Sequence, residues 1–166
     1  MPILIPADGE GVRAPSARLA RGIALGFPPG DDAAEAIAAV LETMTATPRA
    51  GLWGTYWAIG TLDGAPVTQG ISGFKHAPDA AGIVEIAYYT FPAFEGTGVA
   101  SAMVAALLRI AEGAATGVIA HTLPERNASG AVLTRNGFVF EGEVFDPEDG
   151  PVWRWRKPSA GNPPGR

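Results

Sequence analysis

The spacing of hydrophobic residues changes from a helical period to a strand period near residue 52. Over 31–44, apolar residues recur at helical spacing behind two aspartates suited to an N-cap and a first turn, so we predict a helix there. From Leu52 the period falls to two, as in a strand with one buried face. Asp63-Gly64 then supplies a turn with positive φ, which predicts a hairpin with its returning strand over 67–75.

The second half of the chain continues this mixture of strands and helices. A β-branched and aromatic run over 83–91 predicts a third strand, which Pro92 stops. The elements predicted after it are a helix from 99, a buried strand over 118–123, a second helix over 127–136, and a closing hairpin over 138–145 and 152–157. The fold class that follows is α/β in the α+β sense, with a central, mostly antiparallel mixed sheet flanked by helices. We expect one domain over 1–157 and a disordered tail over 158–166.

The composition indicates a compact globule. The chain has 166 residues, 47% of them hydrophobic and 17% charged, and its 22 Gly and 15 Pro predict frequent turns. Because the chain has no cysteine, disulfides, thiolate zinc sites and a cysteine nucleophile are excluded. The net charge of -5, without a clustered basic stripe, argues against a nucleic-acid binder, since neutralising phosphates requires Lys and Arg.

No segment of the sequence is suited to a membrane or to a secretory signal. The first six residues have too short an apolar run, and no preceding positive charge, for a signal peptide. The longest apolar helix, over 99–108, has about half the length that a bilayer span needs. We therefore expect a soluble, cytoplasmic protein. The two histidines, His76 and His121, lie too far apart in sequence to indicate a metal site.

The glycine-rich turn Glu95-Gly96-Thr97-Gly98-Val99-Ala100-Ser101 follows a strand and opens a helix. Such a turn can hold phosphate, because several backbone N–H groups converge at the positive end of the helix dipole. A P-loop would need a lysine at the helix start, and a dinucleotide fingerprint would need Gly or Ala at Ser101 and an acidic residue near 119–121. Both are absent. A tight turn without a ligand is the alternative interpretation.

Several segments together resemble the GNAT superfamily of acetyl-CoA-dependent N-acetyltransferases, and most of all its RimJ/RimL-type branch. These segments are Val84-Glu85-Ile86-Ala87-Tyr88, Pro92, Glu95-Gly96-Thr97-Gly98-Val99-Ala100, Asn127-Ala128-Ser129 with Leu133, and Asn136-Gly137-Phe138. The resemblance covers about residues 53 to 157. It implies a GNAT-type fold in which the strand ending near Phe91 splays away from the strand over 118–123. The V-shaped cleft between them would take acetyl-CoA as the acetyl donor.

The resemblance also implies which residues hold the cofactor. The pantetheine arm would bond along Tyr89, Thr90 and Phe91 like an added strand. The pyrophosphate would lie on the loop and first helical turn formed by Glu95, Gly96, Thr97, Gly98, Val99, Ala100 and Ser101, with Asn127 and Ser129 on the far wall. The chain departs from the family pattern twice. Glu95 stands where the family usually has Gln or Arg, and Thr134 stands where many relatives carry a tyrosine that protonates the departing thiolate.

The proposed chemistry needs a base, because an amine acceptor is protonated at neutral pH and must lose a proton before it attacks. Glu85 is the first candidate, since it lies within an apolar strand and the same position carries the base in several family members. His121 ends the other strand of the cleft and is the second. Tyr89, or its neighbour Tyr88, is a candidate proton donor to the thiolate. The alternatives are a structural partner for Glu85, no catalytic duty for His121, and a thiolate that needs no acid.

The sequence therefore predicts transfer of an acetyl group from acetyl-CoA to a primary amine, by direct attack in a ternary complex. The acceptor would be a peptide N-terminus or a small-molecule amine, and the residues do not specify which. A CoA-binding or regulatory module without turnover is the alternative, and an interaction domain with the same fold is another. Homodimerisation is common in the resembling family, but no feature of this sequence decides it.

Overall fold

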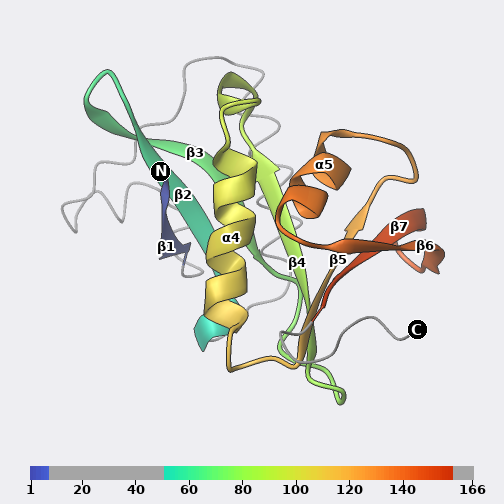
Figure 1. Ribbon diagram of the computed structural model, residues 1–166. Helices are drawn as coiled ribbons and strands as arrows, with labels where there is room; N and C mark the ends of the chain where they lie inside the picture. Colours follow the sequence, from blue (N-terminus) through green and yellow to red (C-terminus); the bar gives the residue numbers. More distant parts are fainter. Residues whose placement is uncertain (8–50, 159–166) are drawn as a thin grey trace.

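The computed structural model describes residues 1–7 and 51–158 (Figure 1). The helix predicted over 31–44 and the tail predicted beyond 158 lie outside the described residues. Within the described residues the strands are β1 (Ile3–Ala7), β2 (Thr55–Leu62), β3 (Ala65–Phe74), β4 (Ile83–Thr90), β5 (Gly117–Thr122), β6 (Val139–Asp146) and β7 (Gly150–Lys157). The helices are α4 (Val99–Ala111) and α5 (Ala128–Arg135), with short 3-10 turns η1 (Gly51–Trp53) and η2 (Pro92–Phe94).

The strands that the structure describes form one seven-stranded sheet in the order β1-β2-β3-β4-β5-β7-β6. All neighbouring pairs are antiparallel except β4 and β5, so the predicted mostly antiparallel mixed sheet is confirmed. The parallel pairing of β4 with β5 runs only from Ile83 opposite Gly117 to Ile86 opposite Ala120. Because β4 continues to Thr90, the two strands part beyond this last pair.

The local signals that predicted the elements have clear structural counterparts. Asp63 (φ 51°) and Gly64 (φ 79°) both take the left-handed conformation that a tight turn between β2 and β3 requires. Asn127 caps α5 by accepting a hydrogen bond from the Gly130 amide at 3.0 Å. The chain leaves α5 through Gly137, which has a φ of 81°.

Strand β1 was not predicted from the sequence. Pro2 and Pro6 flank or interrupt its short apolar run, and proline removes a donor from a strand ladder. In the structure β1 is an edge strand that pairs only with β2, so the missing donor of Pro6 can face away from the ladder at little cost.

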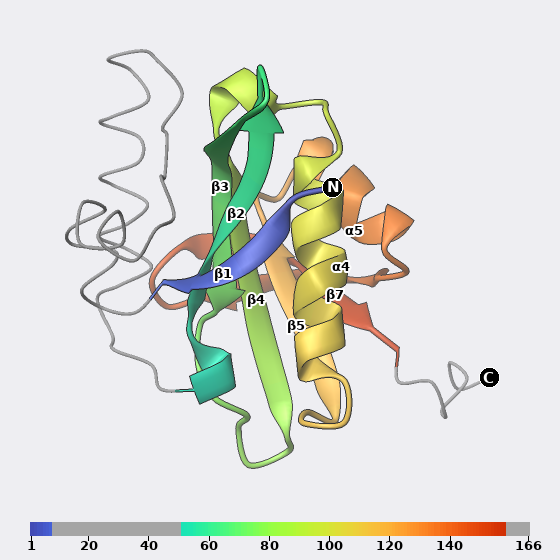
Figure 2. The same ribbon diagram turned by 90° about the vertical axis from the view of Figure 1, so that its left-hand side faces the viewer.

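Both described helices cover the same face of the sheet (Figure 2). The apolar stripe of α4 is buried there, with Met103, Val104 and Leu107 inaccessible to solvent. Met103 belongs to a cluster with Ile71 and Val99. Val104 and Leu107 pack with Leu133 of α5 and with Val84 and Ile86 of β4. Side chains alternate along a strand, so the residues between these, Glu85 among them, face away from α4. No helix in the described residues is long and apolar enough to cross a membrane.

Candidate active site

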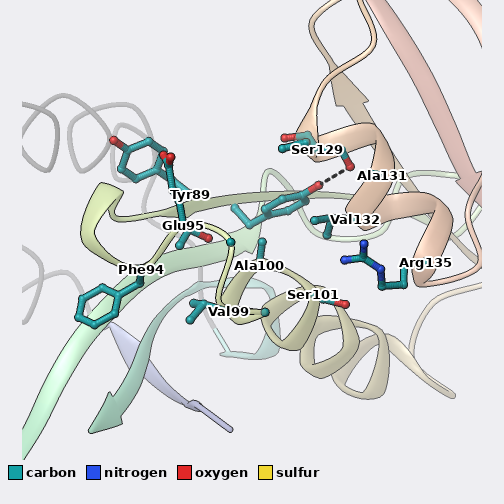
Figure 3. Close-up of a pocket in the computed structure, with 15 residues that line it drawn as sticks. Tyr89, Phe94, Glu95, Val99, Ala100, Ser101, Ser129, Ala131, Val132 and Arg135 are labelled. Atoms are coloured by element: carbon teal, nitrogen blue, oxygen red, sulfur yellow. Dashed lines mark hydrogen bonds between the residues drawn. The ribbon is translucent and has the colours of Figure 1, made fainter. Parts of the chain in front are cut away.

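A cavity of about 550 Å³ lies on the helical face of the sheet, beside the end of β4 that extends beyond its pairing with β5 (Figure 3). Its walls are the end of β4, the glycine loop, the first turn of α4 and one side of α5. The lining residues are Tyr88, Tyr89, Thr90, Phe94, Glu95, Gly96, Gly98, Val99, Ala100, Ser101, Ala128, Ser129, Ala131, Val132 and Arg135. Nine of the residues predicted to hold a cofactor are among them.

The glycine loop presents backbone donors to this cavity. Gly96 (φ 72°) and Gly98 (φ 87°) are left-handed, and a Cβ on either would meet nothing within 4 Å, so glycine is needed for the conformation and not for packing. Ala102 is the first residue of α4 whose N–H bonds backward, to the Gly98 carbonyl at 3.0 Å. The N–H groups of residues 99–101 have no partner among the described residues, and they lie at the positive end of the helix dipole. This arrangement favours an anion.

Three predicted cofactor residues do not line the cavity, and each is already used in the fold. Phe91 is fully buried and its N–H donates to the Gln69 carbonyl at 2.9 Å. The Thr97 hydroxyl donates to the Phe94 carbonyl. The Asn127 side chain caps α5.

The pairing of β3 with β4 decides which backbone groups of β4 are open. The Phe91 amide bonds to β3, and backbone direction alternates along a strand, so the N–H and C=O of Tyr88 and Thr90 face the side where β5 has departed. The strand groups available to a ligand are therefore shifted by one residue from the predicted Tyr89 and Phe91. The Thr90 hydroxyl oxygen is also buried and has no hydrogen-bond partner within the described part of the chain.

Arg135 is a lining residue that the sequence analysis missed. It projects from the last turn of α5 toward the cavity and, with Glu95, is one of two charged residues in the lining (Figure 3). It makes no ion pair with the residues that the structure describes. In the sequence it looks like an ordinary basic residue favouring a helix C-terminus. Only the packing of α5 beside α4 brings it to the cavity.

The Asn136 side chain forms hydrogen bonds with both helical walls of the cavity. Asn136 Nδ2 donates to the Ser101 hydroxyl at 3.0 Å and to the Val132 carbonyl at 2.9 Å. Ser101 lies in the first turn of α4, so this amide joins the start of α4 to the end of α5. Lys157 Nζ in turn donates to the Asn136 carbonyl at 2.8 Å and ties the same corner to β7.

The two predicted base candidates meet on the opposite face of the sheet. Glu85 is 7% exposed, and its Oε1 lies 3.0 Å from His121 Nδ1 and 2.8 Å from Lys75 Nζ. Burial lowers the pKa of Lys75, but the hydrogen bond and charge of Glu85, with the charges of Asp149 and Asp146, outweigh it and hold that pKa above its ordinary value. No motif or spacing in the sequence pointed to Lys75 as a member of this group.

The tyrosines at the cavity differ in what their hydroxyls do. Tyr88 donates to the Ser129 carbonyl at 3.3 Å, and burial raises the pKa of Tyr88 to about 12, which makes it a weak proton donor. Tyr89 is half-buried, and its hydroxyl has no hydrogen bond to the described residues. The Thr134 hydroxyl donates to the Gly130 carbonyl at 2.8 Å and lies outside the cavity lining.

The sequence matches the acetyltransferase (GNAT) domain family over residues 14–139, which includes the glycine loop, both cleft strands and α5. The chain belongs to the GNAT acetyltransferase family. No curated protein matches it in sequence.

Solved structures of GNAT proteins share its fold. The acetyltransferase of the GNAT family from Streptococcus pneumoniae aligns with a TM-score of 0.57 at 16% identity, covering 95% of this chain and 99% of that one. The fold is also similar to that of the microcin C7 self-immunity acetyltransferase MccE in complex with acetyl-CoA and AMP. That alignment has a TM-score of 0.61 at 14% identity and covers 93% of this chain and 90% of that one. RimL, the ribosomal L7/L12 alpha-N-protein acetyltransferase, aligns with a TM-score of 0.54 at 18% identity, covering 92% of this chain and 87% of that one. At these low sequence identities, the comparisons with solved structures show that the fold is shared.

Proposed function

We propose that this GNAT protein is an N-acetyltransferase that moves the acetyl group of acetyl-CoA to a primary amine on a peptide N-terminus or a small molecule, as in the RimJ/RimL branch. One observation carries the proposal. The cavity on the helical face is lined by the end of β4 beyond its pairing with β5, and the buried Glu85–His121 pair lies next to the last paired residues on the other face. A donor and an acceptor could thus approach the same opening from opposite sides.

The residues of the cavity fit acetyl-CoA. Its pyrophosphate would take the unpaired amides of 99–101 and the backbone of Gly96 and Gly98. Its pantetheine amides would pair with the open backbone groups of Tyr88 and Thr90, in the manner of an added strand, with Tyr89 and Ser129 alongside. When bound, acetyl-CoA supplies the acetyl group as a thioester.

Glu95 and Arg135 have opposite effects on this fit. The Glu95 carboxylate is exposed at the cavity rim and opposes a phosphate there. Arg135 supplies a guanidinium that can bond a phosphate through two parallel N–H groups. We propose that Arg135 restores the positive charge that the loop loses through Glu95.

The catalytic residues that we propose are Glu85, His121 and Tyr89. The buried pair of Glu85 and His121 would receive the proton of the amine. Tyr89 is the tyrosine with an uncommitted hydroxyl in the cavity lining, and it would donate a proton to the departing thiolate. Holding the amine and the thioester together would supply much of the rate enhancement.

Acetyl-CoA binding is the first test. A ligand at 100 times its dissociation constant stabilises the folded protein by about 2.7 kcal/mol, so acetyl-CoA should raise the melting temperature. NADH and ATP, at equal concentration, are the controls and should not. A melting temperature that acetyl-CoA leaves unchanged would contradict the proposed cofactor.

A second candidate function is a CoA-binding module without turnover. The position of Thr134 favours it, because α5 offers no acidic hydroxyl to the cavity. An acetylation screen over peptide N-termini, polyamines, amino acids and aminoglycosides separates the two. Thermal stabilisation without any acetylated product would support the binding module.

A further inference from the structure

Three titratable side chains form a chain of hydrogen bonds on the sheet face that points away from α4. Lys75 directly follows β3, Glu85 lies in β4 and His121 lies near the end of β5. Glu85 Oε1 accepts from Lys75 Nζ at 2.8 Å and from His121 Nδ1 at 3.0 Å. The side chains of Glu85 and His121 are only 10% and 14% exposed, so water screens this arrangement weakly.

The hydrogen bond to Glu85 sets the tautomer of His121. An ionised carboxylate can only accept hydrogen bonds, so Nδ1 must carry the proton in the contact. In a neutral imidazole this leaves Nε2 with a free lone pair. That atom is buried and has no hydrogen-bond partner among the residues that the structure describes. An unpartnered buried acceptor is costly, and a substrate N–H would satisfy it.

The register of the two strands decides which of the pair lies closer to the opening. The last paired residues are Ile86 and Ala120, and His121 is the next residue of β5, where the strands part. Glu85 lies before the parting, opposite Ile119, and its Oε1 is already bonded twice. His121 is therefore the member of the pair that has a nitrogen without a partner in the described part of the chain and that directly follows the last paired residues.

We propose that Nε2 of His121 is the atom that takes the proton of the acceptor amine, and that Glu85 and Lys75 are positioning residues behind it. This inference rests on the proposed acetyl transfer. The ammonium group of the acceptor gives one proton to Nε2, and the freed lone pair on nitrogen forms a bond to the acetyl carbonyl carbon. The carbon–sulfur bond breaks with its electron pair on sulfur. Sulfur takes the hydroxyl proton of Tyr89, the second nitrogen proton replaces it on Tyr89, and the imidazolium releases its proton to water.

The other charged groups around His121 are paired. Arg154 of β7 lies opposite His121 in register, and its Nε is 3.1 Å from Glu141 Oε2. The turn between β6 and β7 contributes Asp146, whose charge interacts with both His121 and Lys75, and Asp149, whose Oδ2 is 3.9 Å from Lys75 Nζ. No cation of the described residues therefore faces His121 without an acidic partner.

Nitrogen NMR tests the positioning without needing an acceptor. The chain has two histidines, so a His76→Asn variant leaves His121 as the single source of imidazole signals. In spectra recorded at a pH where His121 is neutral, we expect its proton on Nδ1 and none on Nε2. Glu85→Gln should reduce this preference. A neutral His121 protonated on Nε2 in the wild-type protein would overturn the proposal.

Turnover with an acceptor amine tests the assignment of the base. His121→Asn keeps an amide donor toward Glu85 but has no atom at Nε2, so kcat should fall by about 100-fold or more. Acetyl-CoA affinity, measured on the same sample, should stay unchanged and shows that the variant is folded. His76→Asn is the matched control, because His76 is exposed and, among the described residues, bonds to the carbonyl of Ala77 alone, and it should keep full activity. A His121→Asn enzyme with half or more of the wild-type kcat would overturn the assignment.

Lys75→Met separates a positioning role from a structural one. Without the Lys75 charge, Glu85 stabilises the imidazolium form of His121 more strongly, and the protonated form cannot accept a proton. The acidic limb of the kcat/KM profile should therefore move to higher pH. An unmoved limb would overturn the role of Lys75.

Failure of this inference differs from failure of the proposed function. A wild-type protein that binds acetyl-CoA and acetylates no amine overturns the proposed function, and the base assignment with it. An active wild-type enzyme with an equally active His121→Asn variant overturns the base assignment alone.

Discussion

Arg135 shows how one side chain acquires a role from its neighbours. It is exposed, makes no ion pair within the described residues, and lines the cavity opposite the unpaired amides of α4. A guanidinium in that position adds to the helix dipole, and both favour a phosphate. The acidic Glu95 at the rim makes this cation more important for an anionic ligand.

Replacement of Arg135 tests its role directly. In Arg135→Gln the dissociation constant of acetyl-CoA should rise about tenfold at low salt, because a charge-assisted hydrogen bond to phosphate is lost. The difference should shrink as salt screens the charge. Titration calorimetry at two salt concentrations measures both effects. Arg109→Gln, on an exposed arginine of α4 outside the lining, is the control, and equal affinities of all three proteins would contradict the prediction.

At the scale of elements, the cleft depends on how α4 and α5 are held relative to β4. The Asn136 amide bridges Ser101 and Val132, and the Tyr88 hydroxyl bridges β4 to the Ser129 carbonyl. These polar contacts cross between elements whose other contacts are apolar. They therefore fix the width of the cavity better than the apolar contacts, because hydrogen bonds have narrow geometric limits.

Removal of the Asn136 amide should loosen this corner. We expect Asn136→Ala to lower the free energy of unfolding by about 1 kcal/mol, because it leaves the partly buried Ser101 hydroxyl and Val132 carbonyl without this partner, and to weaken acetyl-CoA binding. Urea unfolding and calorimetry on the same preparation measure the two quantities. Thr134→Val is the control, since it removes a hydrogen bond of α5 that lies outside the cavity, and it should leave affinity unchanged. Wild-type affinity in Asn136→Ala would refute the bridging role.

At the scale of the whole molecule, two aspartates order connections between strands: Asp79 in the loop between β3 and β4, and Asp146 at the turn between β6 and β7. Asp79 Oδ1 accepts from the amides of Ala81 and Ile83 at 2.8 and 2.9 Å, and Asp146 Oδ1 accepts from those of Glu148 and Asp149 at 2.8 and 3.0 Å. These hydrogen bonds from the backbone lower the pKa of each carboxyl below its ordinary 3.8. The largest contribution comes from the Ile83 amide for Asp79 and from the Asp149 amide for Asp146.

This shift gives the stability of the protein a dependence on acid. A depressed folded pKa contributes stability that is complete above the unfolded value of 3.8 and is lost as pH falls through the folded value. The double variant Asp79→Asn and Asp146→Asn should therefore lose less of its melting temperature than wild type between about pH 5 and 2. Thermal unfolding over a pH series measures this, and parallel curves for the two proteins would argue against it.

Local chemistry predicted most of the described elements. The Asp63-Gly64 turn, the apolar stripe of α4 and the Asn127 cap each act within a few residues, so they are legible in the sequence. Strand β1 was missed because its prolines are tolerated only at an edge, and edge position is a property of the whole sheet. The parting of β4 and β5 came from the family resemblance, since no local pattern encodes where two strands stop pairing.

The sequence by itself determined which residues could do chemistry, because hydrophobic period, turn residues and side-chain types act locally. Only the tertiary structure decided which of them meet. Glu85 and His121 are 36 residues apart, and the parallel register of β4 with β5 brings them to 3.0 Å. The antiparallel register of β3 with β4 puts Lys75 beside Glu85, and the packing of α5 beside α4 puts Arg135 at the cleft. The sequence alone could not decide this, because pairing and packing depend on contacts between distant segments.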